Sequence, residues 1–200
     1  MYQSFFLFQT PLDLAHAYWS QLVQPGDIVV DATCGKGKDT LILCQLALSS
    51  PQGCVYGLDI QSQALIATQH YLAHHHFLMG HPQIIVEQRC HSLFPDSIKP
   101  QTVKLIVYNL GYLPGADKSQ TTQVETTLAS LTKAQELLMP GGAISITCYP
   151  GHAEGAREQE ALLKIVSQWP SRQWSCCHHQ WLNRQHSPSL LLLQKSRLTE

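Results

Sequence analysis

The sequence predicts a doubly wound α/β fold built on a mostly parallel sheet. Short apolar runs, several of which end in an acid or an amide, alternate with stretches of helical periodicity. The predicted order of elements is β-α-β-α-β-β-α-β-α-β-β, in which the last two strands form an antiparallel pair that closes the sheet. We therefore expect seven strands with one late antiparallel strand. Right-handed crossovers would place the polar strand ends along one rim of this sheet.

The first predicted strand ends in a turn that contains two glycines. The segment reads Asp31-Ala32-Thr33-Cys34-Gly35-Lys36-Gly37-Lys38-Asp39-Thr40 and leads into a helical pattern. Gly35 and Gly37 permit positive φ angles and a close approach of backbone to a ligand, which the first N–H groups of the helix would face. The third glycine of the dinucleotide fingerprint is missing, so a plain tight turn also fits. The segment is a candidate entrance to a nucleotide-type cofactor site.

The next three strand ends also carry polar residues. Asp59 ends the second strand about 20 residues later, where α/β folds place the carboxylate that accepts hydrogen bonds from a ribose. The third strand leads to Arg89-Cys90-His91-Ser92, and the fourth leads to Asn109-Leu110-Gly111-Tyr112. This succession resembles the order found in S-adenosylmethionine (SAM) dependent methyltransferases of the Rossmann-like class.

Capping residues and helix breakers predict the boundaries of the other elements. Thr10 is a predicted N-cap with Pro11 at the first helical position, and residues 1–26 are expected to form a helical prop or lid within a single domain of 200 residues. The remaining predicted elements are a helix at 62–79 that ends at Gly80, a helix at 122–139 closed by Pro140-Gly141-Gly142, a strand at 143–149, a helix at about 156–167, and strands at 174–182 and 189–194.

Composition excludes several classes of protein. Apolar residues make up 44% of the chain and charged residues 14%, which excludes a disordered protein. The formal net charge is −1 at pH 7, so any RNA contact must depend on a local patch or on shape rather than on overall charge. No apolar run approaches the roughly 20 residues of a membrane span. The candidate cations for RNA contact are Lys118, Arg157, Arg184, Lys195 and Arg197.

Cysteine and histidine usage predicts a cytoplasmic protein without a metal site. The seven cysteines are scattered and odd in number, which favours free thiols over a disulfide framework. The N-terminal segment lacks the basic region and the small-residue cleavage site of a signal peptide. His74-His75-His76 would fan around a helix, and neighbours in Cys176-Cys177-His178-His179 would alternate across a strand, so neither run is expected to hold one metal ion.

Four segments together resemble the signatures of one protein family. They are Asp31–Thr40, Gly57–Gln61, Tyr108–Lys118 and Tyr149–Gly155, and the third is the most specific. The family is a small bacterial and plastid group of methyltransferases, long labelled rRNA methylases and associated with methylation of 5-aminomethyl-2-thiouridine at wobble position 34 of tRNA. The sequence departs from the family pattern at Lys36, Lys38 and Ala116. The resemblance implies a Rossmann-like class I methyltransferase fold that uses SAM and releases S-adenosylhomocysteine.

The resemblance also implies which residues bind the cofactor. The set is Asp31, Cys34, Gly35, Lys36, Gly37, Lys38, Asp39, Asp59, Gln61, Cys90, His91, Ser92 and Asn109. Within it, the two glycines would face the methionine part of SAM, Asp59 the ribose, and Cys90-His91-Ser92 the adenine. Asp59 is also compatible with a helix-capping acid, and His91 with a histidine in a surface loop.

The residues with implied catalytic roles are Asn109, Tyr112, Asp117 and His152. Methylation needs a neutral amine whose lone pair is aimed at the methyl group, and a carbonyl from the Asn109 side chain or the Leu110 backbone can hold its N–H groups. Tyr112 would stack on the thiouracil ring, and Asp117 or His152 would accept a proton, although ordinary loop structure also explains the last two. The implied partner is a tRNA anticodon stem-loop, with a homodimer as a possible assembly.

Three other interpretations stay open at this point. The substrate of a methyltransferase with this sequence could be rRNA or a small amine. The chain could instead bind SAM as a regulatory or assembly protein without turnover. An NAD-dependent enzyme fits less well, because the third glycine is missing and the segment that begins at Asn109 has no place in such an enzyme.

Overall fold

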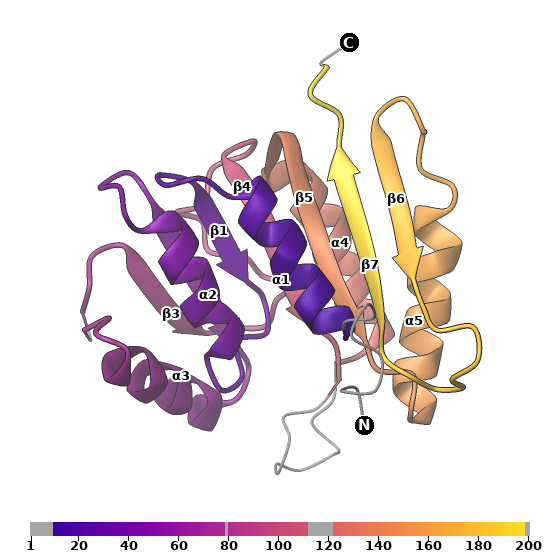
Figure 1. The fold of residues 1–200 in the computed structure, drawn as a ribbon, viewed down its shortest axis with the longest axis horizontal. Coiled ribbons are helices and arrows are strands. Elements are labelled where there is room, and N and C mark those ends of the chain that lie inside the picture. The colour runs from indigo at the N-terminus through magenta and orange to yellow at the C-terminus, as the bar shows by residue number, and fades with distance from the viewer. Residues whose placement is uncertain (1–9, 79, 112–121, 199–200) are drawn as a thin grey trace.

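The computed structural model describes residues 10–78, 80–111 and 122–198. They form a seven-stranded sheet with the order β3-β2-β1-β4-β5-β7-β6 (Figure 1). β7 runs antiparallel to both of its neighbours, and the other pairs are parallel. The strands are β1 (Ile28–Asp31), β2 (Cys54–Asp59), β3 (Ile84–Gln88), β4 (Val103–Asn109), β5 (Leu138–Cys148), β6 (Trp174–His179) and β7 (Ser189–Lys195). The predicted fold class, including the single late antiparallel strand, is confirmed.

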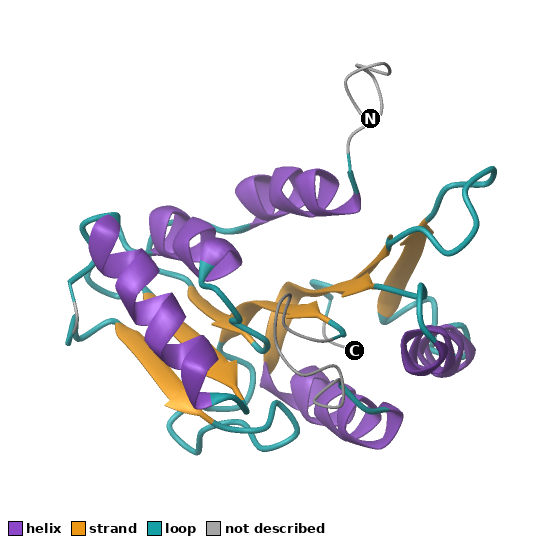
Figure 2. Ribbon diagram, turned by 90° about the horizontal axis from the view of Figure 1, so that it is seen from below, coloured by secondary structure: helices purple, strands orange, loops and turns teal. Residues whose placement is uncertain are grey.

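Helices cover both faces of the sheet, with α1, α2 and α3 on one face and α4 and α5 on the other (Figure 2). They are α1 (Pro11–Leu22), α2 (Lys38–Ala47), α3 (Ser62–His74), α4 (Val124–Leu137) and α5 (Ala153–Val166). Successive strand residues point to opposite faces, so Val29 belongs to the apolar core under α1 to α3 and Val30 to the core under α4 and α5. This alternation is what commits the chain to two layers of helices.

The N-terminal helix begins where the sequence predicts. Thr10 is the N-cap, Pro11 is the first helical residue, and Asp13 completes a capping box with Thr10. Ala15 and Trp19 are buried, and α1 packs against β7, β5 and β4. Among the described residues no helix is long and apolar enough to cross a membrane.

The predicted end of the third helix was wrong. α3 ends at His74 rather than near Gly80, because His76 adopts a left-handed conformation with φ 70°. The Phe77 N–H donates to the Leu72 carbonyl and the His76 N–H donates to the Ala73 carbonyl, which is the hydrogen-bond pattern of a Schellman cap. Phe77 then packs onto the apolar core. Gly80 is left-handed as well, with φ 80°, but it lies several residues beyond the helix, and His76 is the residue that ends it.

The predicted loop between α4 and β5 was also wrong. α4 ends at Leu137, and Leu138 already pairs with Val103 of β4. The next paired residues are Ala143 and Leu105, so the Pro-Gly-Gly run at 140–142 lies in an irregular stretch inside β5 rather than between two elements. Proline and glycine are tolerated in a strand at such irregularities because the ladder of hydrogen bonds is already interrupted there.

The carboxyl ends of β2, β1 and β4 lie side by side and carry Asp59, Asp31 and Asn109. The strand order reverses between β1 and β4, since the chain builds outward from β1 through β2 and β3 and then returns to place β4 on the other side. Crevices at such a switch point are where open α/β sheets bind ligands.

Candidate active site

A cavity of about 630 Å³ opens at this rim of the sheet. Its volume lies within the range of small-molecule sites, roughly 300 to 1,000 Å³. The lining residues come from the turn after β1 and the start of α2, the ends of β2, β3 and β4, the residue after β5, the residues before and within α4, and the start of α1. They are Leu12, Ala32, Thr33, Cys34, Gly35, Lys36, Lys38, Asp39, Asp59, Ile60, Gln61, Arg89, Cys90, His91, Asn109, Gly111, Thr122, Gln123, Thr126 and Tyr149.

Asp59 holds two turns of backbone together at one end of the cavity. One carboxylate oxygen accepts from the Gly35 N–H at 3.0 Å, and the other accepts from the Gln61 N–H at 2.9 Å. Burial raises the pKa of Asp59, and the hydrogen bonds from the two N–H groups oppose that shift. Gln61 is the N-cap of α3, so Asp59 braces the helix start while its carboxylate lines the cavity. A carboxylate fixed in this way can still accept from a ligand hydroxyl.

Asp31 lies behind the cavity rather than in its wall. The side chain is fully buried and accepts hydrogen bonds from the Thr40 hydroxyl at 2.6 Å and from the Thr33 N–H at 3.3 Å. Burial, followed by the charge of Asp39, raises the pKa of Asp31 to about 7. Asp31 therefore ties the end of β1 to the first turn of α2.

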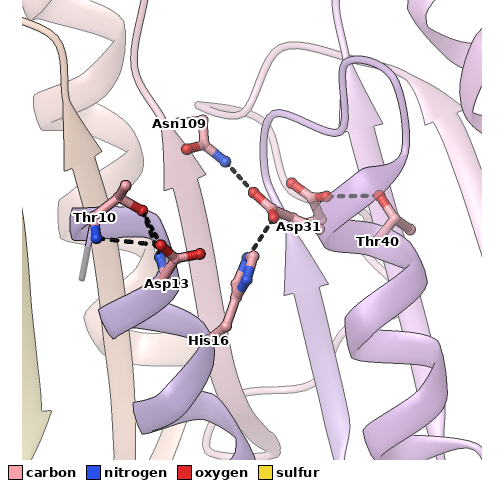
Figure 3. Close-up of polar contacts among 7 residues, drawn as sticks. Thr10, Asp13, His16, Asp31, Thr40 and Asn109 are labelled. Carbon is pink, nitrogen blue, oxygen red and sulfur yellow. Dashed lines mark hydrogen bonds and ion pairs between the residues drawn. The ribbon is translucent and has the colours of Figure 1, made fainter. Parts of the chain in front are cut away.

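The opposite end of the cavity is organised around Asp39, which is 7% exposed. Its Oδ2 accepts from the Asn109 side-chain amide at 2.5 Å, and its Oδ1 accepts from His16 Nε2 at 2.7 Å. In Figure 3 these contacts are the dashed lines that run from the labelled Asn109 and His16 to one carboxylate, which has no label of its own. The Asn109 backbone N–H donates to the Thr33 hydroxyl at 2.7 Å. Because a carboxylate can only accept, the amide nitrogen of Asn109 must face Asp39. The Asn109 carbonyl oxygen is then the side-chain atom left to accept from a ligand.

A buried carboxylate on α5 fixes the edge of the cavity next to Asn109. The Gly111 N–H donates to the Thr122 hydroxyl at 2.9 Å, and the Thr122 N–H donates to the Gly111 carbonyl at 3.0 Å. Thr122 and Thr127 both donate their hydroxyl protons to Glu158, a buried carboxylate on α5. Burial raises the pKa of Glu158, and the two hydroxyls counteract the shift.

A comparison with protein families identifies the chain. The family model described as "Putative rRNA methylase" matches residues 55–195. The chain belongs to this family. A curated relative, the chloroplastic tRNA (mnm(5)s(2)U34)-methyltransferase of Arabidopsis thaliana, is 37% identical over 187 residues, which cover 92% of this chain and 68% of the relative.

Solved structures of similar proteins have the same fold over nearly their whole length. An rRNA methylase homologue from Clostridium thermocellum is 33% identical, covers 94% of this chain and 98% of its own, and superposes with a TM-score of 0.85. A protein from Streptococcus mutans described as "a putative methyltransferase" was crystallised in complex with SAH. It is 30% identical, covers 94% of this chain and 99% of its own, and has a TM-score of 0.80. The chain therefore has the Rossmann-like methyltransferase fold of its family.

Most of the predicted cofactor residues of this rRNA methylase family member line one cavity. Those that do are Cys34, Gly35, Lys36, Lys38, Asp39, Asp59, Gln61, Cys90, His91 and Asn109. Asp31, Gly37 and Ser92 are not among the described lining residues. Ser92 Oγ lies 3.0 Å from Cys90 Sγ, within hydrogen-bond distance, and Gly37 packs against α3. Lys36 and Lys38, which depart from the family pattern, are both exposed at the cavity mouth.

The predicted catalytic residues divide into three groups. Asn109 lines the cavity, whereas Tyr112 and Asp117 lie outside the described residues. His152 is the N-cap of α5, and its Nδ1 accepts from the Gly155 N–H at 3.1 Å. The Nδ1 atom is therefore already used as the acceptor of the helix cap. The predicted role of His152 as a proton acceptor stays a prediction.

Sequence reasoning missed the contribution of α1 to the site. Leu12 lines the cavity and His16 binds Asp39, although the first 26 residues were expected only to prop or cover the domain. The periodicity of the segment identified a helix, but nothing in it indicated which strand ends the helix would reach. Among the candidate cations for RNA contact, Lys195 is at the opposite rim, where its Nζ donates to the carbonyls of Gln135 and Leu138 at 3.0 Å.

Neither histidine-rich run forms a metal site in the part of the chain that the structure describes. No group of three or more His, Cys, Asp or Glu side chains is placed there to hold a metal ion. Cys176 and Cys177 are free and exposed on β6, the edge strand of the sheet.

His91 leads to a prediction about stability at acid pH. The residue is 5% exposed, which contradicts a surface loop histidine, and burial lowers the pKa of its imidazole to about 4. The same histidine has a pKa near 6.5 in the unfolded chain. Between about pH 6.5 and about pH 4, the unfolded chain therefore binds a proton at His91 more strongly than the folded chain does. The free energy of unfolding should fall as pH decreases through this window, by up to about 3 kcal/mol.

We expect His91→Gln to lose less stability than the wild-type protein between about pH 7 and about pH 4.5, measured by urea unfolding at each pH. His70→Gln, a change at an exposed histidine of α3, is the matched control and should behave as the wild type does. Equal losses in the wild type and His91→Gln would show that His91 does not titrate as described.

Proposed function

We propose that the protein transfers a methyl group from SAM to the amine of 5-aminomethyl-2-thiouridine at position 34 of tRNA, which gives 5-methylaminomethyl-2-thiouridine. The observation that carries this proposal is Asn109 at the end of β4, with its amide nitrogen held by Asp39 and its carbonyl oxygen left for a ligand. The name of the Arabidopsis relative supports the choice of substrate. The same proposal includes binding of the anticodon stem-loop, a homodimeric assembly and a cytoplasmic location.

The residues that line the cavity fit SAM. Asp59 offers a fixed carboxylate for ribose hydroxyls, and the exposed Lys36 and Lys38 offer cations for the methionine carboxylate. Cys90 and the buried, neutral His91 line the wall beyond Asp59, which suits an uncharged adenine ring. When bound, SAM supplies an electrophilic methyl group on sulfonium. The SAH complex of the Streptococcus mutans relative supports this assignment.

The corner around Asn109 can orient an amine for methylation. A neutral amine has two N–H groups and one lone pair, and a carbonyl that accepts one N–H restricts the direction of the lone pair. Asn109 is fixed at both its backbone and its side chain, so this acceptor is in place before the substrate arrives. Gly111, Thr122 and Thr126 line the adjoining wall, where the base that carries the amine would lie.

The test is mass spectrometry of nucleosides from tRNA of a strain that lacks this gene. Accumulated 5-aminomethyl-2-thiouridine should gain one methyl group when purified protein and SAM are added, and the same incubation without SAM is the control. Binding of SAM is measured in parallel by calorimetry. A protein that binds SAM but leaves this tRNA unmethylated would refute the proposed substrate.

A second candidate substrate is rRNA, because the description of the family model names it. Total rRNA from the same strain is therefore incubated under the same conditions. A methyl group that appears in rRNA and not in tRNA would favour this alternative.

A further inference from the structure

We propose that His16 is a positioning residue for methyl transfer: it holds the Asp39 carboxylate so that the Asn109 carbonyl oxygen stays directed at the acceptor amine. This inference rests on the proposed function and adds a residue of α1 to the active site. It concerns the chain of contacts from His16 to Asp39 and from Asp39 to Asn109, which three separate elements bring together (Figure 3).

Both oxygens of Asp39 are occupied, one by each neighbour. His16 Nε2 lies 2.7 Å from Oδ1, and Asn109 Nδ2 lies 2.5 Å from Oδ2. An ionised carboxylate has no proton to give, so both neighbours must donate. His16 therefore carries a proton on Nε2, and Asn109 presents its nitrogen to Asp39 and its oxygen away from it.

Without His16, the Asp39 carboxylate and the Asn109 amide would no longer be held in one orientation. Asp39 is nearly buried, and an unpaired oxygen on a buried carboxylate is costly. The carboxylate would relieve that cost by turning toward another donor, and its Oδ2 would then move away from the Asn109 amide. An amide that has lost this acceptor is free to turn over. By donating to Oδ1, His16 keeps Asp39 an acceptor on both sides.

The packing of α1 holds the imidazole in place. The His16 ring lies against the Trp19 ring with centroids 4.8 Å apart, and Trp19 is 2% exposed in the core. The capping box of Thr10 and Asp13 fixes the start of the same helix one turn earlier. The His16 side chain is 26% exposed and mostly buried, but leucine and glutamine are close to it in size, so that either can keep much of the contact with Trp19. A substitution here should therefore affect the direction of the hydrogen bonds more than the fold.

The first experiment compares His16→Leu with His16→Gln in steady-state methylation of tRNA that carries the 5-aminomethyl base. Leucine cannot donate, whereas the glutamine amide nitrogen can replace Nε2 as a donor to Asp39. We expect His16→Leu to lower kcat by about 10- to 100-fold, with KM for SAM within about threefold of the wild type. If kcat of His16→Leu is a hundredfold below the wild type, kcat of His16→Gln should be about tenfold or more above that of His16→Leu. His70→Leu on the exposed face of α3 is the matched control and should leave kcat unchanged.

A double-mutant cycle tests whether His16 acts through Asn109. If it does, His16→Leu should lower kcat by less than about threefold when Asn109 is already alanine. Full and independent losses in the double variant would overturn the proposal, and so would a glutamine variant no more active than the leucine variant.

A spectroscopic readout separates this inference from the proposed substrate. The side-chain NH2 signals of Asn109 are assigned in ¹H–¹⁵N spectra by their absence in Asn109→Ala. They should shift and exchange faster with solvent in His16→Leu, and should stay near their wild-type positions in His16→Gln. Unchanged signals in His16→Leu would refute the positioning role even if tRNA is methylated. The expected shifts in a protein that does not methylate tRNA would refute only the substrate.

Discussion

Asn109→Ala is expected to lower kcat for methylation of the 5-aminomethyl base by about 100- to 1,000-fold, the range that follows loss of one preorganised hydrogen-bonding group. The substitution removes the carbonyl that would accept from the amine, and it also leaves Asp39 Oδ2 without its donor. Asp59 and the turn after β1 do not depend on Asn109 for their hydrogen bonds to each other. The dissociation constant for SAM should therefore stay within about threefold of the wild-type value.

The measurement combines single-turnover methylation at saturating SAM with calorimetric titration of SAM. Asn183→Ala, which removes an exposed asparagine before β7, is the matched control and should leave both quantities unchanged. A variant at position 109 that keeps more than about a tenth of the wild-type rate would show that its side chain is not the acceptor. A wild-type protein that binds SAM and methylates none of the tested RNAs or amines would favour a regulatory protein.

Gly37→Ala is expected to lower the free energy of unfolding by about 3 kcal/mol or more. Gly37 has a φ of 78°, and a Cβ at this position would lie 2.8 Å from Thr68 Cα on α3. The left-handed conformation alone costs a non-glycine residue about 1 kcal/mol or more, and the clash is with backbone, which cannot move aside without separating α2 from α3. The effect is measured by urea unfolding at neutral pH.

Gly80→Ala is the control that isolates the clash. Gly80 has a φ of 80°, nearly the same as Gly37, but a Cβ there would meet no atom within 4 Å. The control should therefore lose only the conformational part, about 1 kcal/mol. If the two variants were destabilised equally, close packing of the turn against Thr68 would not be what requires glycine at position 37.

The sheet could be predicted from the sequence because each strand has a local sequence pattern. A strand such as β1 is a short run of consecutive apolar residues, in which Val29 and Val30 are both buried, one in each core, and several strands end in a polar residue. Each of these signals occupies only a few consecutive positions. The end of α3 was harder to predict, because the left-handed residue is His76 rather than a glycine. The start of β5 was misplaced for a related reason: Pro140-Gly141-Gly142 normally breaks an element, and here an irregular stretch inside a strand accommodates it.

Most residues of the candidate site could be predicted from the sequence, but the contacts between their side chains could not. The strand ends and the turn after β1 supplied Asp59, Asn109 and most of the cavity wall. The contact between His16 and Asp39 depends on where α1 lies across the sheet, which no pattern within the helix specifies. Gly37 shows the converse: a glycine that looked like a ligand contact is required by the packing of α2 on α3.

The position of α1 also determines when the active site can form during protein synthesis. α1 is the first helix described, yet it packs against β7, the last strand, and Tyr18 contacts His179 across 161 positions of sequence. Contacts so distant along the chain form late in folding, because the closure of a long loop must precede them. The segment from β1 through α2 to β2 leaves the ribosome well before β7 does. α1 also packs on β4 and β5, but its contact with β7 must wait for nearly the whole chain. We therefore expect a chain that ends before β7 to hold His16 less firmly beside Asp39, and its acceptor corner to be less ordered than its cofactor pocket.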